Sequence, residues 1–332
     1  MEIRINKAIL HILDNNSPQP VFSQSELELN EGIANYIARH IEKLITDDGT
    51  RDASLFQDSP FHAFAESIQD RENFLGVSID IAQRLHKIMV SNITIPNADL
   101  LVAMVTIDAQ EYLALIKFNY KEGYTHFVNY NEQGIDNQII THKVLFASES
   151  QKNDEGALIR FEDKSVKVAE KPYEINGEKT FYFSKMFLGC STHYSQKESL
   201  KIVNTVAARI GKKYFDDSFE TASRVKTVLH ELVEDDNEID VEKVAHSVFE
   251  SKPEIKEEYI SEIKQAGVPE RIRITSQKAE NRLSKHKIKT DNGIELSIPM
   301  ELYKNKDVVE FITNYDGTTS LIIKNIQRFI SK

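Results

Sequence analysis

The alternation of apolar and polar positions predicts a central antiparallel sheet between residues 98 and 147. Three apolar segments, residues 100–107, 112–120 and 138–147, are separated by segments rich in Asp, Glu, Asn and Gly. The first segment is almost wholly apolar, which is typical of a strand covered on both faces. We therefore expect a β-meander whose strands form the interior of the sheet, with Val102 and Leu115 buried.

The segments on either side of this meander predict further strands and two helices. Apolar positions recur every three or four residues over 29–45 and 74–90, so we expect two helices that pack on the sheet. Ser25 and Glu28 have the spacing of a capping box, which places the start of the first helix there. The polar residues 46–58 predict a mobile connection. Further strands are expected at residues 3–13, 156–161, 166–169 and 179–183, with a hairpin turn at Asn176-Gly177.

Helical periodicity dominates from residue 195 to 267. Asp240 is the expected N-cap of a helix over 241–249, and Gly267 is expected to end a helix over 255–266. The acidic run over 231–242 lacks the glycine and the terminal ligand of a calcium loop, so we interpret it as a solvated, mobile connector. Beyond it, Asp291-Asn292-Gly293 and Tyr315-Asp316-Gly317 predict two hairpins.

These patterns predict an α+β fold: a central antiparallel sheet with packed helices, a helical block, and a small C-terminal β-rich segment. We expect three domains. They are an α+β domain over residues 1–194, the helical block over 195–268, and a basic link with β-hairpins over 269–332.

Composition narrows the functional classes. The 332 residues include 41 Lys and Arg against 52 Asp and Glu, a net charge of −11, so uniform attraction to nucleic acid or anionic membrane is not expected. The lone Cys190 excludes an internal disulfide. The N-terminus has no signal-peptide pattern and no segment approaches the length of a membrane span. We expect a cytoplasmic protein without membrane contact.

The residues indicate no catalytic or cofactor site. Cys190 and His193 lie three positions apart, but no third group orients them, and a single Cys is usually a small buried hydrophobe. No glycine-rich phosphate loop, histidine pair at metal-ligand spacing, or carboxylate and lysine constellation on the predicted strands is found. We therefore expect no cofactor and no metal. Among the candidate functions, a nuclease or hydrolase is the least favoured.

A local basic segment contrasts with the acidic chain. Residues 271–289 hold seven cations and one acid, Glu280. The cations are Arg271, Arg273, Lys278, Arg282, Lys285, Lys287 and Lys289. A weaker set, on the helix after residue 195, comprises Lys197, Lys201, Arg209, Lys212 and Lys213. The segment is either a solvated face that pairs with the acidic helical block or a surface that contacts successive phosphates without reading bases. DNA and RNA remain alternatives.

The segment Phe187-Leu188-Gly189-Cys190-Ser191, leading into a basic helix, resembles the signature of the 37 kDa bacterial nucleoid-associated protein family. The pattern Ile-x-x-Ala-Ile-x-x-Ile-Leu from Ile5 to Leu13 and the tail over 293–324 support the resemblance, which spans nearly the whole chain in order. It implies a cytoplasmic, non-enzymatic protein found with the bacterial chromosome. It transfers no binding residue, so the twelve candidates rest on charge placement alone.

Two functions follow from this resemblance and the charge pattern. The first is a non-enzymatic protein that binds DNA through local basic patches, with modest affinity and little sequence preference. The second is a protein-interaction module that is recruited to the nucleoid by a DNA enzyme such as a topoisomerase, or by another nucleoid protein. The oligomeric state is left open, with a dimer among the alternatives.

Overall fold

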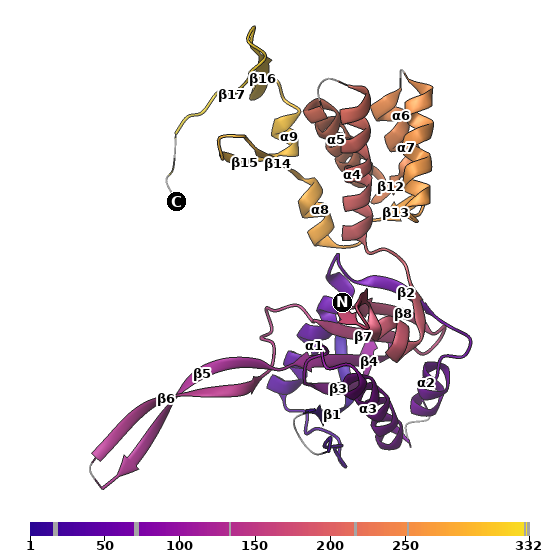
Figure 1. Cartoon of the computed structure of the whole chain (residues 1–332), viewed down its shortest axis with the longest axis vertical. Helices are drawn as coiled ribbons and strands as arrows, with labels where there is room; N and C mark the ends of the chain where they lie inside the picture. The colour runs from indigo at the N-terminus through magenta and orange to yellow at the C-terminus, as the bar shows by residue number, and fades with distance from the viewer. Residues whose placement is uncertain are drawn as a thin grey trace. The chain divides into compact units, whose positions relative to one another are not determined.

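The computed structural model describes residues 1–15, 19–69, 73–132, 134–215, 218–250, 252–328 and 330. The chain divides into two compact units, residues 1–193 and 194–332, both of which are drawn in Figure 1. The α+β class is confirmed, because a central antiparallel sheet, packed helices and small C-terminal hairpins are all present. The division into three domains stays a prediction.

In its described residues the first unit contains a seven-stranded sheet with every neighbouring pair antiparallel. In spatial order the strands are β1 (Ile3–Leu13), β3 (Ala98–Ile107), β4 (Gln110–Asn119), β7 (Glu155–Arg160), β8 (Ser165–Ala169), β2 (Arg51–Leu55) and β11 (Cys190–Thr192). The β2 strand lies in the stretch for which we expected a mobile connection, and that prediction was wrong. Its polar side chains alternate with the buried Ala53, so its apolar content is too low to stand out in the sequence.

Helices cover both faces of this sheet, as the unbroken apolar pattern of β3 predicts. Leu100 and Val102 belong to a core packed with α2 (Phe61–Gln69) and α3 (Phe74–Ser91). Leu101 and Ala103 face the other way, into a core that includes residues of α1 (Glu31–Thr46). Leu115 lies directly opposite Val102, and both are fully buried as expected.

The first helix begins later than its sequence suggested. Asn30 is the N-cap of α1, and its side chain accepts a hydrogen bond from the Ile33 amide at 2.9 Å. The capping box at Ser25 and Glu28 is therefore absent. The Ser25 amide instead lies 3.4 Å from the Ser23 hydroxyl, and the Leu27 amide is bonded to the Ala8 carbonyl, so this segment runs alongside β1 before the helix starts.

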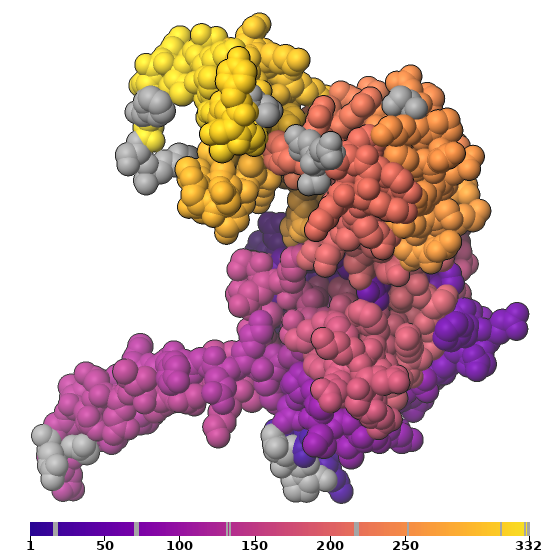
Figure 2. Space-filling view, turned by 45° about the horizontal axis from the view of Figure 1, so that its top comes forward, coloured from indigo at the N-terminus to yellow at the C-terminus, as the bar shows by residue number. Residues whose placement is uncertain are grey.

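The third strand of the expected meander lies outside the central sheet. It falls in β6 (Gly134–Leu145), which pairs with β5 (Lys121–Asn131) in a separate two-stranded ribbon. Figure 2 shows this ribbon as a magenta arm that projects from the first unit. The neighbour of β4 in the sheet is instead β7. At Gly123 the chain does not turn: the pairing of β5 with β6 shifts register between Lys121 and Gly123, and β5 continues to Asn131.

The family-like segment ends the first unit in buried packing. After the hairpin of β9 (Tyr173–Ile175) and β10 (Glu178–Thr180), a short π-helix η1 (Phe183–Leu188) leads to Gly189 and then to β11. Gly189 has a φ of 67°, which favours glycine. Arg84 of α3 donates hydrogen bonds to the carbonyls of Met186 and Phe187 at 2.8 and 2.7 Å. The segment is thus a structural element of the core.

In its described part the second unit begins with helices around a core of their own. They are α4 (Gln196–Tyr214), α5 (Ser218–Asp236), α6 (Val241–Phe249), α7 (Pro253–Gln265) and α8 (Gln277–Leu283). Asp240 caps α6 and Gly267 follows α7 in a left-handed conformation, as expected.

The acidic run is ordered structure rather than a mobile connector. It comprises the end of α5 and the strand β12 (Glu238–Asp240), which pairs with β13 (Arg271–Arg273). Ile239 of β12 is fully buried beside Ile272 of β13. Val233 and Val241 of the same run are buried in the same core, so the apolar residues between the acids anchor the segment. The charge pattern had obscured them.

Two predicted hairpins complete the second unit. They are formed by β14 (Lys285–Lys289) with β15 (Glu295–Pro299), and by β16 (Val309–Thr313) with β17 (Thr319–Ile323), joined by α9 (Met300–Tyr303). Aromatic contacts link them to α5. The ring of Phe219 in α5 lies 6.0 Å from that of His286 in β14 and 5.6 Å from that of Phe311 in β16.

Candidate nucleic-acid interface

Local structure presents the cations of the basic segment on the surface of the second unit. In β14, Lys285, Lys287 and Lys289 alternate with side chains that are buried or half-buried, so all three point to the exposed face. Lys278 and Arg282 are four residues apart on α8, and both are exposed. The strand and the helix therefore expose their cations for the same reason: the intervening apolar side chains pack inward.

Four predicted cations meet around one groove of about 260 Å³. Lys197 and Lys201 reach it from α4, Arg282 from α8 and Lys285 from β14. Its other lining residues are Leu200, Asn204, Lys226 and Leu283, so none of the described residues that line it is acidic. We call these eight residues the cationic groove. It joins the strong and the weak basic sets, which the sequence had presented separately.

Lys226 of α5 is a fifth cation in the groove, and sequence reasoning missed it. Arg224 is the one other Lys or Arg in its helix, and both lie outside the two basic clusters, so charge density gave no signal. The side chain is half-buried, and this burial lowers its pKa. A bound anion would favour the charged form of Lys226 and oppose that shift.

Other predicted cations are paired with carboxylates of the second unit. Arg271 lies 3.5 Å from Glu238 and 3.8 Å from Asp240, and the Lys289 ammonium lies 2.9 Å from Glu295. On the far end of α4, Arg209 pairs with Glu262, and Lys213 lies 2.7 Å from Glu258. Arg273, Lys278, Lys287 and Lys212 are exposed but do not line the groove. The structure therefore contains both alternatives, intramolecular pairing and a cationic surface, at different residues.

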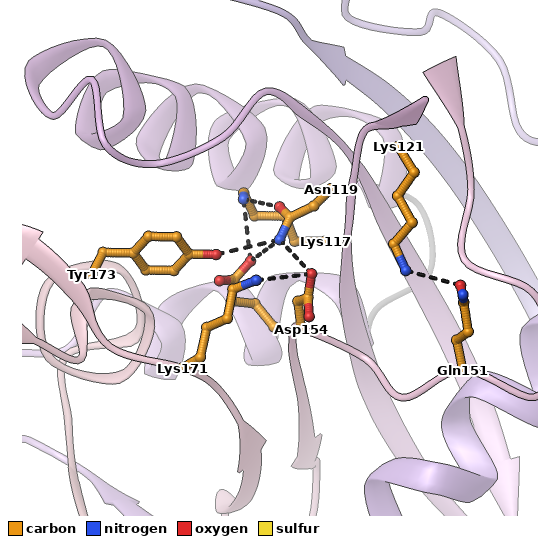
Figure 3. Close-up of polar contacts among 8 residues, drawn as sticks. Lys117, Asn119, Lys121, Gln151, Asp154, Lys171 and Tyr173 are labelled. Carbon is orange, nitrogen blue, oxygen red and sulfur yellow. Dashed lines mark hydrogen bonds and ion pairs between the residues drawn. The ribbon is translucent and has the colours of Figure 1, made fainter. Parts of the chain in front are cut away.

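The first unit contains a buried polar cluster that we had not expected (Figure 3). The Lys117 ammonium of β4 lies 3.1 Å from the Glu155 carboxylate of β7, and it also donates to Asn119. Asn119 in turn donates to Asp154 at 3.0 Å, and the Lys171 ammonium lies 3.1 Å from the same carboxylate. Burial lowers the pKa of Lys117, an effect that the Glu155 charge opposes.

This cluster corrects the expectation that no carboxylate and lysine constellation exists on the strands. Lys117 and Glu155 lie on neighbouring strands, with Asp154 directly before the second, and sequence separation had hidden the arrangement. Both side chains of the central pair are fully buried. The adjoining cavity, lined by Lys117, Asn119 and Asp154 among others, has a volume of about 10 Å³, the space of one water molecule. In the described residues no group of three or more His, Cys, Asp or Glu side chains could hold a metal ion.

Cys190 is a buried core residue in the structure. It is 1% exposed, its Sγ lies 3.5 Å from the Ser184 carbonyl, and burial raises the pKa of its thiol to about 12. A thiol with this pKa is almost entirely protonated at neutral pH. Because only the thiolate is a good nucleophile, Cys190 is not set up for nucleophilic attack. The geometry thus fits the packing role that we preferred for it.

Comparison with known proteins supplies the family. No curated protein matches the chain. Among the helices of its described residues, none combines the length and the apolar content of a membrane span. The family model described as nucleoid-associated protein YejK matches residues 9–330, which is nearly the whole chain. This match agrees with the resemblance carried by the buried Phe187-Leu188-Gly189 segment and the N-terminal strand. The chain therefore belongs to the family of nucleoid-associated protein YejK.

Proposed function

We propose that this nucleoid-associated protein binds the phosphate backbone of duplex DNA in the cationic groove, with modest affinity and little sequence preference. The observation that carries the proposal is the convergence of five cations from four elements on a groove with no acidic residue among its described lining. Family membership supports association with DNA, and the groove supplies a surface on which that association can occur.

The walls of the groove strengthen its attraction for phosphate. Leu200 and Leu283 contribute apolar surface next to the ammonium and guanidinium groups. Apolar walls lower the local dielectric and focus the field of charges that line a cleft. A net charge of −11 over the whole chain repels DNA, so contact is restricted to this surface and affinity stays modest.

Cations on a groove of this kind contact the DNA backbone rather than the bases. Lys is a point charge without the planar fork that reads guanine, and four of the five groove cations are Lys. Phosphates are present in every sequence, so such contacts position a protein without selecting a site. We therefore expect similar affinity for duplexes of unrelated sequence.

The test compares two double variants with equal changes in charge. Lys201→Gln with Arg282→Gln removes two groove cations, whereas Arg209→Gln with Lys213→Gln removes two cations that are paired with acids of α7. Binding of each full-length protein to labelled duplex DNA is measured by fluorescence anisotropy at several salt concentrations. The groove variant is expected to bind more weakly on every duplex and to lower the salt slope by about two, at roughly 0.9 per lost phosphate contact.

The paired-cation variant is expected to keep most of the wild-type affinity and slope. Equal losses in both variants would show that net charge, rather than the groove, governs binding. Unchanged binding in the groove variant would remove the groove as the contact surface. Recruitment to the nucleoid by a protein partner such as a topoisomerase would then be the leading proposal, testable by capture from nuclease-treated bacterial extract.

A further inference from the structure

A second groove lies next to the cationic groove on helix α4. It has a volume of about 420 Å³, and its apolar walls are Tyr194, Ile202, Val206 and Ala266. We call it the apolar groove. Sites for small organic groups typically have volumes of roughly 300–1,000 Å³ and mostly apolar walls, so the apolar groove is large enough to admit an aromatic ring system.

The two grooves occupy adjoining faces of α4. The cationic groove takes residues 197, 200, 201 and 204 of this helix, and the apolar groove takes residues 198, 201, 202, 205, 206 and 209. Each set has the three- and four-residue spacing of one helix face, and the two sets are offset by one residue, a rotation of about 100°. Lys201 belongs to both sets and forms the ridge between them. One ligand can therefore reach both grooves across a single side chain.

The two grooves differ in charge. Five cations line the cationic groove, whereas the apolar groove has Lys201 and Arg209 with Glu198 and Glu262, a formal charge of 2 − 2 = 0 among its described lining residues. Arg209 is paired with Glu262, and Glu198 accepts hydrogen bonds from the amide and the hydroxyl of Ser195 at 3.0 and 2.9 Å. An anion therefore suits the cationic groove, and an uncharged group suits the apolar groove.

Tyr194 gives the apolar groove an aromatic wall. Its side chain is 43% exposed, and a Cβ added to Gly267 would lie 3.6 Å from its ring, so the ring is seated against the turn that follows α7. Every base has a π face that can stack on such a ring, whatever its sequence. The Thr205 hydroxyl of the same groove already donates to the Lys201 carbonyl at 2.8 Å. The groove is thus suited to stacking rather than to reading base edges.

We propose that the apolar groove binds an unpaired base of a DNA strand whose phosphates lie in the cationic groove. The inference rests on the proposed function, because the cationic groove is what brings the strand to α4. A DNA strand carries an uncharged base beside each phosphate, and the two grooves offer matching surfaces on either side of Lys201. Bases of an intact duplex are paired and stacked, so a single-stranded stretch or a gap must supply this base.

The first test uses the wild-type full chain and no variant. Fluorescence anisotropy compares a labelled oligothymidylate with an abasic strand of the same length, which keeps every phosphate and lacks the bases. The bases are expected to strengthen binding roughly 5- to 100-fold, the factor that corresponds to one base stacked on an aromatic ring. The salt slope should be the same for both strands, because it counts phosphate contacts. Equal affinity for the two strands would overturn the proposal.

The second test assigns the effect to one ring. Tyr194→Ala should remove most of the advantage of the base-bearing strand, whereas Tyr194→Phe retains the ring and should keep it. Tyr214→Ala is the matched control, since Tyr214 is 40% exposed at the other end of α4 and is not among the described residues that line either groove. All of these proteins should bind the abasic strand and an intact duplex equally, which also verifies that they are folded. A base advantage that survives in Tyr194→Ala, or an equal loss in Tyr214→Ala, would contradict the proposal.

The outcomes separate this inference from the proposed function. If Lys201→Gln with Arg282→Gln leaves binding of both the duplex and the abasic strand unchanged, the cationic groove is not the contact surface and both proposals fail. If that variant binds both more weakly, while wild type binds the base-bearing and abasic strands equally, the proposed function stands and the apolar groove does not hold a base. A gapped duplex should bind wild type more tightly than the intact duplex of the same sequence, and the absence of this preference would count against the base site alone.

Discussion

The Lys117 ammonium lies 3.1 Å from the Glu155 carboxylate at a point where neither side chain is exposed to solvent. Removing two charges from water is costly, and their attraction offsets that cost only when the geometry is good and other hydrogen bonds complete it. Asn119 provides such bonds, since it accepts from Lys117 and its amide nitrogen lies 3.1 Å from Glu155. Each of the two charges is therefore compensated by the other within the core of the first unit.

We predict that Lys117→Met destabilises the first unit by about 3–5 kcal/mol, because it leaves the Glu155 carboxylate buried without a countercharge. Adding Glu155→Gln removes that charge and should restore much of the lost stability. Urea unfolding of the wild type, both single variants and the double variant forms a complete cycle. Additive effects of the two substitutions would contradict the coupling.

Acid is expected to destabilise the first unit between pH 6.5 and 4 through His11. The Ser23 amide donates to Nδ1 of His11 at 3.2 Å and Nε2 lies 3.1 Å from the Ser78 hydroxyl, an arrangement that suits the neutral ring. Burial lowers the pKa of His11 from 6.5 to about 4. The unfolded chain thus takes up the proton first as pH falls, and stability decreases by up to about 3 kcal/mol by pH 4.

Urea unfolding of wild type and His11→Gln at several pH values measures this effect. The stability of the variant should change less between pH 6.5 and 4 than that of the wild type. Replacement of the exposed His193 by Gln is the matched control and should leave the wild-type pH dependence unchanged. An identical pH profile for His11→Gln and wild type would assign the acid sensitivity to other groups.

Gly189→Ala is predicted to cost about 1–3 kcal/mol, because Gly189 has a φ of 67° that an L residue adopts only with strain. An added Cβ would lie 3.5 Å from Ser59, an ordinary contact, so the cost is one of backbone conformation. Gly32→Ala in α1 is the control. It should be neutral or stabilising by up to about 1 kcal/mol, since Ala is the better helix former. Thermal unfolding that shows no difference between the two variants would contradict the prediction.

Regular patterns made much of the fold predictable from sequence. The unbroken apolar run of β3 indicated a strand covered on both faces, and Asn176-Gly177 indicated the turn between β9 and β10. The ribbon was misplaced because alternation shows that a strand has an apolar face without showing what it packs on. The strand β2 was missed because its pairing with β8 and β11, rather than its own side chains, stabilises it.

The candidate site was less predictable, because it depends on contacts between distant segments. Charge density identified Lys201 and Arg282, but it gave no sign that α4 and α8 would place them around one groove. It also gave no sign of Lys226, whose helix holds only one other Lys or Arg, Arg224. Conversely, the sequence indicated Arg271 as a cation that could contact phosphate, yet β12 places two carboxylates beside it.

The carboxylates beside Arg271 have a consequence for selectivity among anions. Glu238 and Asp240 are tethered to the chain, so they compete with any approaching anion at a high and constant effective concentration. A dissolved phosphate ion must displace them unaided, at a cost of up to about 1 kcal/mol for exposed pairs. A polyanion that is already bound at another part of the surface presents its next phosphate at a comparable effective concentration. That phosphate can therefore replace the two carboxylates beside Arg271. The acidic strand thus acts as an internal competitor that screens Arg271 from small anions while leaving it open to a long one.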